Sequence, residues 1–166
     1  HSTTKYINGH SDVVGGAVVA ATKDLHDQLA WWANALGLTG GAFDSFLTLR
    51  GLRTLQARLA VHGANSGELA PWLAKQPGVK QVYYPGLPTH PGHEIARRQQ
   101  TGMGAIITFE LAGGEAAVRR FVEGVEYFSL AESLGGVESL VAHPASMTHA
   151  AMAPEARAAA GLVDGL

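Results

Sequence analysis

The sequence predicts an α/β protein built from alternating helices and short strands. Two amphipathic helical patterns occupy residues 24–36 and 43–73, and two strand patterns follow at residues 79–84 and 103–111. A third helical pattern begins after Gly113. Strands alternating with helices in this way indicate an α/β or α+β layer structure.

One lysine, Lys5, lies in a hydroxyl-rich loop directly before the apolar run at residues 13–20. That run, Val-Val-Gly-Gly-Ala-Val-Val-Ala, predicts a buried strand. A lysine ammonium is strongly hydrated and normally stays in water, so its position directly before a predicted core strand requires an explanation. A desolvated lysine becomes a nucleophilic amine that forms a Schiff base with a carbonyl compound or pyridoxal phosphate, and Ser2 and Thr4 would then bind the phosphate. Spacing alone also allows an ordinary solvent-exposed lysine.

The first helix is expected over residues 24–36. Thr22 begins a helix-start signal, and Gly37 ends the pattern. Within the helix, leucines and one tryptophan recur three or four residues apart. The neighbouring Trp31 and Trp32 cannot share a helix face, so we expect one in the core and the other against an adjacent element.

A longer amphipathic pattern runs from Phe43 to about Gly63 and continues through Leu73. It ends at the Gln-Pro-Gly sequence of residues 76–78, which is a strong stop signal. We expect the arginines of this helix to be solvated or ion-paired rather than catalytic: Arg50, Arg53 and Arg58.

Two histidines in the middle of the chain suggest a metal site at first sight. His90 and His93 are separated by Pro-Gly, so they do not share a helix face. A solvated loop is the better interpretation, and no metal is expected.

Residues 128–140 combine a short apolar strand with a tight turn that carries Glu132 and Ser133. The Gly135-Gly136 pair adopts backbone conformations closed to other residues and lets a ligand approach closely. Taken alone, this stretch predicts a structural turn.

Composition excludes several classes of function. The 166 residues are 46% hydrophobic and 16% charged, with a net charge of -2 and no cysteine. Disulfides, thiolate metal sites and a cysteine nucleophile are therefore excluded. No basic cluster indicates a nucleic-acid or anionic-membrane surface. Because no apolar run approaches the roughly 20 residues of a membrane span, we expect an intracellular, cytoplasmic protein.

Four motifs resemble one enzyme family. Residues 2–11 look like the lysine signature of the Cys/Met-metabolism family of pyridoxal-phosphate enzymes, with small hydroxyl residues, Thr-Lys, an aromatic, an aliphatic and then Gly-His. Residues 50–55, Arg-Gly-Leu-Arg-Thr-Leu, are similar to its helix motif. Residues 132–140 resemble its substrate-facing loop, and residues 143–149, His-Pro-Ala-Ser-Met-Thr-His, another of its segments.

The resemblance implies the fold type I, aspartate-aminotransferase-like fold of PLP-dependent transferases. Residues 1–63 would be the C-terminal part of the PLP-binding large domain. Residues 64–166 would be most of the C-terminal small domain, incomplete at its end. The chain would then be a C-terminal fragment of a homotetrameric enzyme, inactive without its missing N-terminal part.

The resemblance also implies roles for particular residues. Lys5 would hold pyridoxal 5'-phosphate and act as general base, while Ser2 and Thr4 would bind the cofactor phosphate. Ser133 would hold the substrate carboxylate, and Glu132 would shape the pocket toward the amino group of cysteine. Asn34 matches, by its position after the lysine, an asparagine that reaches a neighbouring subunit's active site.

Glutamate at position 132 resembles the γ-acting branches of the family, and the run at residues 30–34 is closest to bacterial γ-synthases. The resemblance therefore implies γ-replacement that joins cysteine to an O-acyl-L-homoserine and forms cystathionine, in methionine biosynthesis and transsulfuration. The alternative within the family is a γ-lyase that cleaves cystathionine. A noncatalytic interaction module that needs its missing half is the alternative outside enzymes.

Overall fold

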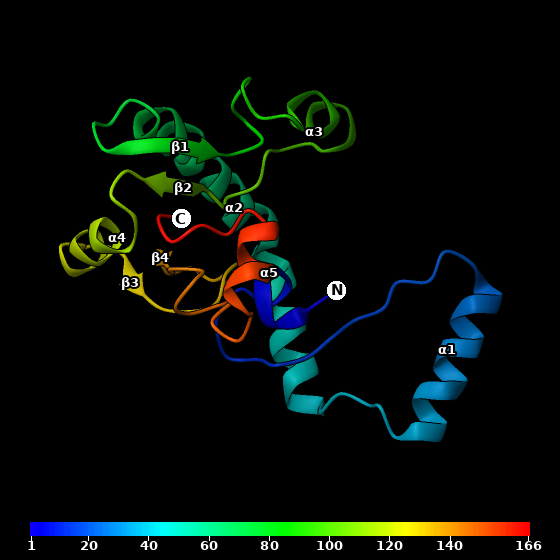
Figure 1. The fold of residues 1–166 in the computed structure, drawn as a ribbon. Coiled ribbons are helices and arrows are strands. Elements are labelled where there is room, and N and C mark those ends of the chain that lie inside the picture. The colour runs from blue at the N-terminus through cyan, green and yellow to red at the C-terminus, as the bar shows by residue number, and fades with distance from the viewer. The chain divides into compact units, whose positions relative to one another are not determined.

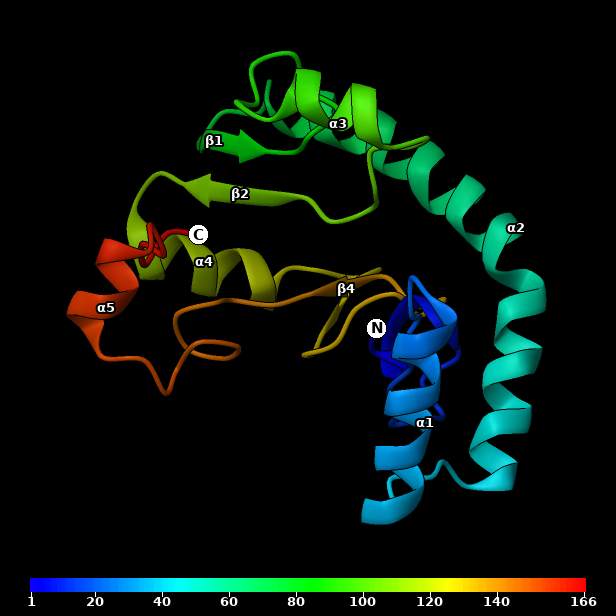
Figure 2. The ribbon, with the colours of Figure 1, turned by 90° about the vertical axis from the view of Figure 1, so that its right-hand side faces the viewer.

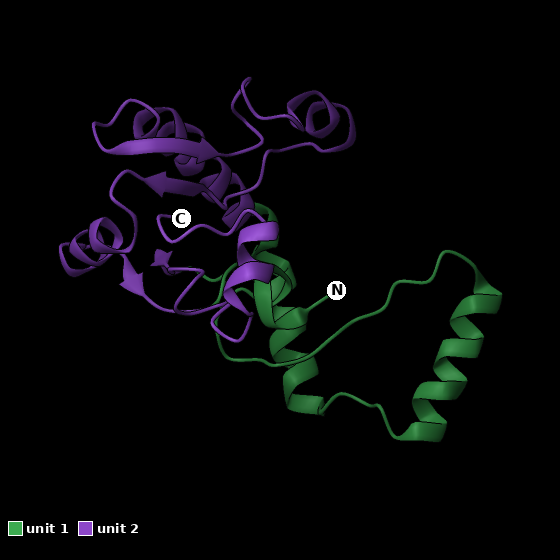
Figure 3. Ribbon diagram, in the orientation of Figure 1, with its two compact units in different colours: residues 1–56, 133–137 green, residues 57–132, 138–166 purple.

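The computed structural model describes all residues from 1 to 166 and has a mixed α/β architecture (Figure 1). The chain forms two compact units. Unit 1 contains residues 1–56 and 133–137, and unit 2 contains residues 57–132 and 138–166 (Figure 3). The expected domain boundary near Gly63 lies in the same helix that the two units share.

Unit 1 begins with a distorted helical turn, η1 (Thr3–Ile7). Lys5 interrupts the helical conformation there, with φ -102° and ψ -129°. The turn is closed by two backbone hydrogen bonds, from Asn8 N to Thr3 O (3.1 Å) and from Gly9 N to Lys5 O (2.8 Å).

Helix α1 (Lys23–Leu36) follows and confirms the helix predicted over residues 24–36. The Thr22 hydroxyl accepts a hydrogen bond from Leu25 N, which satisfies one of the free N–H groups of the first turn. At the other end, Gly37 adopts the left-handed conformation with φ 71°, the usual way for a glycine to end a helix.

The expectation of a buried strand over residues 13–20 is wrong. The segment is extended but belongs to no sheet, and Val14 is 87% exposed. Its backbone pairs only at Gly15 to Ala17, which face residues 1–3 of the chain. A strand is stabilised by a continuous ladder with a neighbour, and no such neighbour lies beside this segment.

The expected burial of the tryptophans is also wrong. Trp31 and Trp32 are 62% and 55% exposed, and their rings meet edge to face with centroids 4.8 Å apart. Helix α1 has no buried residue at all. The amphipathic pattern predicted the helix correctly, but nothing in this chain covers its apolar side.

Helix α2 (Ala42–Leu73) is continuous through both predicted helical stretches, as expected. Its last turns begin the core of unit 2. Four buried residues form that core: Ala70, Leu73, Val82 and Tyr84. Ser66 Oγ and Tyr84 OH are 3.0 Å apart and both donate to Gly104 O, so these hydroxyls keep partners inside the core.

Strand β1 (Val79–Tyr83) confirms the first predicted strand, and it pairs antiparallel with β2 (Thr108–Leu111) inside the second. Helix α4 (Gly114–Glu123) lies beside β2 (Figure 2). The rings of Phe109 on β2 and Phe121 on α4 meet edge to face. The helix predicted after Gly113 is therefore confirmed.

Three further features complete unit 2. Strands β3 (Ser129–Leu130) and β4 (Leu140–Val141) form a short parallel pair. Helices α3 (His93–Gln99) and α5 (Pro154–Ala159) were not predicted, because each is too short to show a clear helical period. No helix of the chain has the length and apolar character that crossing a membrane requires.

We expect Leu73→Ala to lower the free energy of unfolding by about 2–5 kcal/mol, because it leaves a cavity among Ala70, Val82 and Tyr84. Leu59→Ala on the same helix is the matched control. Leu59 is exposed, so its truncation should change stability by less than about 1 kcal/mol. Urea denaturation of both variants checks this, and equal losses would contradict the assignment of the core.

Candidate functional site

Lys5 lies at the kink in η1. Lys5 departs from helical backbone angles in the middle of the turn, whereas the chain around it closes through the hydrogen bonds to Thr3 and Lys5 carbonyls. Lys5 as a residue is partly buried, whereas the hydrogen bond that its ammonium forms is exposed. An accessible amine on a residue whose backbone departs from regular geometry is a reasonable centre for a site.

Lys5 meets a residue that is 128 positions away in sequence. Lys5 Nζ donates a hydrogen bond of 3.3 Å to Ser133 Oγ. Ser133 has φ 139°, in a region that residues with side chains rarely adopt. The structure therefore brings together two residues, Lys5 and Ser133, that were predicted from separate motifs.

The two predicted phosphate ligands are placed differently. Thr4 Oγ1 accepts a hydrogen bond from Gly15 N (3.1 Å) and lies 3.4 Å from Gly15 O. This hydroxyl already holds the loop to the following segment. Ser2 is exposed and forms a backbone bridge with Gly16, and its hydroxyl is not engaged by another residue.

The glycine turn lies directly against the lysine. A Cβ added to Gly135 would be 2.5 Å from Tyr6 N and 2.9 Å from the carbonyl carbon of Lys5. The sequence predicted that these glycines let a ligand approach closely. In the structure, Gly135 lets the backbone of Lys5 and Tyr6 approach.

Sequence reasoning missed a second group of residues on the other side of η1. Asn8 is completely buried, and its Nδ2 donates to Asp12 Oδ1 (2.7 Å). Asp12 Oδ2 in turn accepts from Arg50 Nη2 (3.1 Å), which confirms the expectation that Arg50 is solvated or ion-paired. The signal that could have revealed this contact is Gly51, a glycine in a helix interior, where it is unfavourable without a reason.

Asn34 and Glu132 do not join this cluster in unit 1. Asn34 is exposed on α1, and its carbonyl accepts the capping hydrogen bond from Gly37 N (3.3 Å). Glu132 is exposed and belongs to unit 2. Their proposed roles stay predictions.

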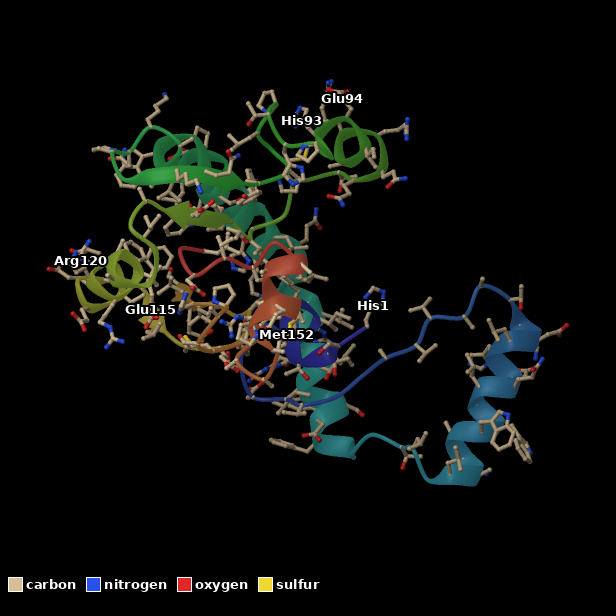
Figure 4. All side chains as sticks on the ribbon, in the orientation of Figure 1. His1, His93, Glu94, Glu115, Arg120 and Met152 are labelled. Carbon is tan, nitrogen blue, oxygen red and sulfur yellow. The ribbon has the colours of Figure 1, made fainter.

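The histidines of the middle segment bond to the local backbone. His90 Nδ1 accepts from Gly92 N (3.0 Å), and His93 Nδ1 lies 2.7 Å from Pro85 O. Figure 4 shows His93 and Glu94 at the start of α3. No three histidine, aspartate or glutamate side chains of the chain come together in a group that could hold a metal ion.

The protonation of the site is affected by burial. Desolvation raises the pKa of the Tyr6 phenol above its ordinary value of 10.0. Tyr6 directly follows Lys5 in sequence, and its phenol is uncharged throughout the neutral range. The arrangement thus consists of a primary amine, a neutral phenol and hydroxyl groups on a glycine-containing turn, which suits the binding of a carbonyl compound.

Comparison with protein families gives a match over the whole chain. The family model described as Cys/Met metabolism PLP-dependent enzyme matches residues 1–166. Cystathionine gamma-synthase of Escherichia coli strain K12 is 59% identical over 166 residues, which is 100% of this chain and 43% of that protein. Cystathionine beta-lyase of Coxiella burnetii is 51% identical and is also covered over 43% of its length.

Comparison with solved structures agrees. The crystal structure of cystathionine gamma synthase from Xanthomonas oryzae pv. oryzae, in complex with aminoacrylate and cysteine, superposes with a TM-score of 0.96 at 72% identity. A cystathionine gamma-lyase from Micromonospora echinospora has a TM-score of 0.93 at 43% identity. Each covers 99% of this chain, which in turn spans 43% of each solved chain.

We expect the Tyr6 phenol to ionise above pH 10.0 in the folded chain. Because its folded pKa exceeds the unfolded value, the free energy of unfolding should be constant below the unfolded pKa and fall as the pH rises through the folded pKa. The difference in phenolate absorbance between the chain and Tyr6→Phe isolates this group. A midpoint at or below 10.0 would show that the ring is not desolvated.

Proposed function

Because the chain belongs to the Cys/Met metabolism family of PLP-dependent enzymes, we propose that it carries the lysine half of a cystathionine γ-synthase site. The whole protein would join cysteine to an O-acyl-L-homoserine by γ-replacement and form cystathionine for methionine biosynthesis. The observation that carries this proposal is the hydrogen bond from Lys5 Nζ to Ser133 Oγ. It connects the lysine signature to the loop that resembles the family's substrate-facing segment.

The residues present fit pyridoxal 5'-phosphate. Lys5 would supply an accessible primary amine for the cofactor aldehyde. The free Ser2 hydroxyl would bind a phosphate oxygen, and Thr4, held by Gly15, would keep the loop in shape or share that phosphate. When bound, this cofactor supplies an electron sink for carbanions at the substrate carbons.

The roles of the chain's own residues follow from their positions. The Lys5 amine would move protons at the substrate Cα and Cβ. Ser133 Oγ would keep Lys5 Nζ in place between transfers and would bind the substrate carboxylate. Glu132, the neighbour of Ser133 in sequence, would contact the amino group of cysteine.

We propose the remaining organisation from the family. The chain would belong to the fold type I architecture, with residues 1–63 in the large domain and residues 64–166 in the small domain. Because this chain spans 43% of its relatives, the rest of the pocket would come from the other part of the protein. The exposed apolar side of α1 and the exposed Asn34 suit a subunit interface in a homotetramer.

A cystathionine γ-lyase is the second candidate, favoured by the similarity to the solved γ-lyase of Micromonospora echinospora. Both activities need the same lysine and serine, so the Lys5 geometry does not distinguish them. A noncatalytic interaction module is the third, and it predicts no covalent cofactor.

We expect the whole protein, incubated with stoichiometric pyridoxal 5'-phosphate and reduced with borohydride, to carry the cofactor mass on the peptide that contains Lys5. The Lys5 amine is the one held by a hydrogen bond to Ser133, so we expect it to react. Tryptic mass spectrometry locates the label.

Lys23→Ala is the matched control for Lys5→Ala, because Lys23 is an exposed lysine of the same unit, paired with Asp27. Lys5→Ala should lose the label, and Lys23→Ala should retain it. Labelling spread over exposed lysines, with none on Lys5, would favour the noncatalytic alternative.

In the whole protein, the γ-synthase predicts that cysteine and O-succinylhomoserine yield cystathionine as the main product. A γ-lyase instead predicts rapid release of cysteine and 2-oxobutanoate from cystathionine. Chromatography of both reactions under the same conditions measures the ratio. Faster cleavage than synthesis would replace the first proposal with the second.

A further inference from the structure

We infer that Gly51 and Gly135 are positioning residues that clamp the backbone of the Lys5 turn from two sides and so set the place of Lys5 Nζ. The inference rests on the proposed role of Lys5, but the clamp itself is a property of unit 1. Both glycines contact main-chain atoms of residues 5–8, which have no flexible end that could move aside. Any side chain at either position would therefore displace the turn.

The first side of the clamp is helix α2. A Cβ added to Gly51 would overlap Asn8 O and would lie 2.7 Å from Asn8 Cα. Gly51 is buried, whereas Gly63 and Gly67 of the same helix have no atom within 4 Å of an added Cβ. Glycine is unfavourable in a helix interior. The contact with Asn8 explains why residue 51 is glycine, and it does not apply to Gly63 or Gly67.

The second side is the turn at residues 133–137. Gly135 has φ 80° and meets Tyr6 N and the Lys5 carbonyl carbon, both closer than real Cβ atoms come to other atoms. Two residues earlier in this turn, Ser133 accepts the hydrogen bond from Lys5 Nζ. The same turn thus fixes the lysine backbone and holds the end of its side chain.

Side chains reinforce the helix side of the clamp. Asn8 is 0% exposed and donates to Asp12, and Asp12 accepts from Arg50, the neighbour of Gly51. The backbone contact and the ion pair therefore act at the same point of α2. Together they tie both ends of the segment from Asn8 to Asp12, which directly follows η1.

The clamp is important for Lys5 because the hydrogen bond from Lys5 Nζ to Ser133 Oγ is already long. The Lys5 Nζ to Ser133 Oγ distance is 3.3 Å, so a displacement of the turn by about 0.5 Å would take the pair beyond hydrogen-bonding range. Misplacement of a reacting group by about 1 Å costs about 100-fold in rate. The positions of Gly51 and Gly135 would thus control the reactivity of the amine.

The test compares Gly51→Ala and Gly135→Ala with two matched variants. Gly63→Ala introduces the same methyl group on the same helix in open space. Gly161→Ala introduces a side chain at φ 76° in open space, so it reproduces the backbone strain of position 135 without the contact. All four are made in the whole protein, and their unfolding midpoints are recorded.

Two readouts separate positioning from general destabilisation. Amide hydrogen exchange by mass spectrometry reports the protection of the Asn8 and Gly9 N–H groups, which close η1. The rate at which Lys5 forms its bond with added pyridoxal 5'-phosphate, trapped with borohydride, reports the amine. Gly51→Ala and Gly135→Ala should lose protection at Asn8 and Gly9 only, and should react about 10- to 100-fold more slowly.

The control variants Gly63→Ala and Gly161→Ala should keep protection of η1 and the wild-type rate. Equal behaviour of the clamp and control variants would overturn the inference, as would loss of protection spread uniformly over the chain.

If Gly51→Ala or Gly135→Ala does not fold, Asp12→Asn provides the test, because it removes the charge opposite Arg50 and should loosen η1 locally. The exchange readout needs no cofactor, so failure of the whole wild-type protein to take up pyridoxal 5'-phosphate would count against the proposed function, and hydrogen exchange would still decide whether the clamp exists.

Discussion

Unit 1 depends on close contact between backbones, which is possible only where side chains are absent. Because Gly51 has no side chain, the backbone of Asn8 lies against α2. Because Gly135 has none, the peptide between Lys5 and Tyr6 lies against the 133–137 turn. These contacts join segments that are far apart in sequence. The hydrogen bond from Lys5 to Ser133 follows from them, because a 3.3 Å distance between flexible side chains is maintained only if both backbones are held.

Unit 2 is stabilised differently, by the burial of apolar side chains around two hydroxyl groups that keep their hydrogen-bond partners. The core around Tyr84 brings the end of α2 against β1 and β2. Ser66 and Tyr84 place hydroxyls in this apolar setting, and Gly104 O accepts from both. An unpaired hydroxyl there would be costly, so the three groups specify how the loop before β2 meets the helix.

Helix α1 forms without the packing that stabilises most protein helices. It has no buried residue, yet a Thr22 cap, a Gly37 stop and the Lys23–Asp27 ion pair at 2.5 Å all act within the helix itself. Local interactions of this kind are individually small, and they suffice to define where the helix begins and ends. Its exposed tryptophans and leucines form an apolar surface of the kind that proteins use to contact partners.

The sequence by itself determined the helices α1 and α2, the strand β1 and the two motifs that carry Lys5 and Ser133, because periodicity, caps and glycine or proline stops are local signals. The sequence did not determine which apolar residues are buried. The predicted burial of residues 13–20 and of the α1 tryptophans was wrong for that reason. An apolar pattern is buried only if another segment covers it, and the pattern itself does not show whether such a segment is present. The short helices α3 and α5 lack enough turns to show a period. Only the tertiary structure brought Ser133 to Lys5 and showed why positions 51 and 135 are glycine. These contacts join segments that are far apart in the sequence, and a single sequence does not show which distant segments meet.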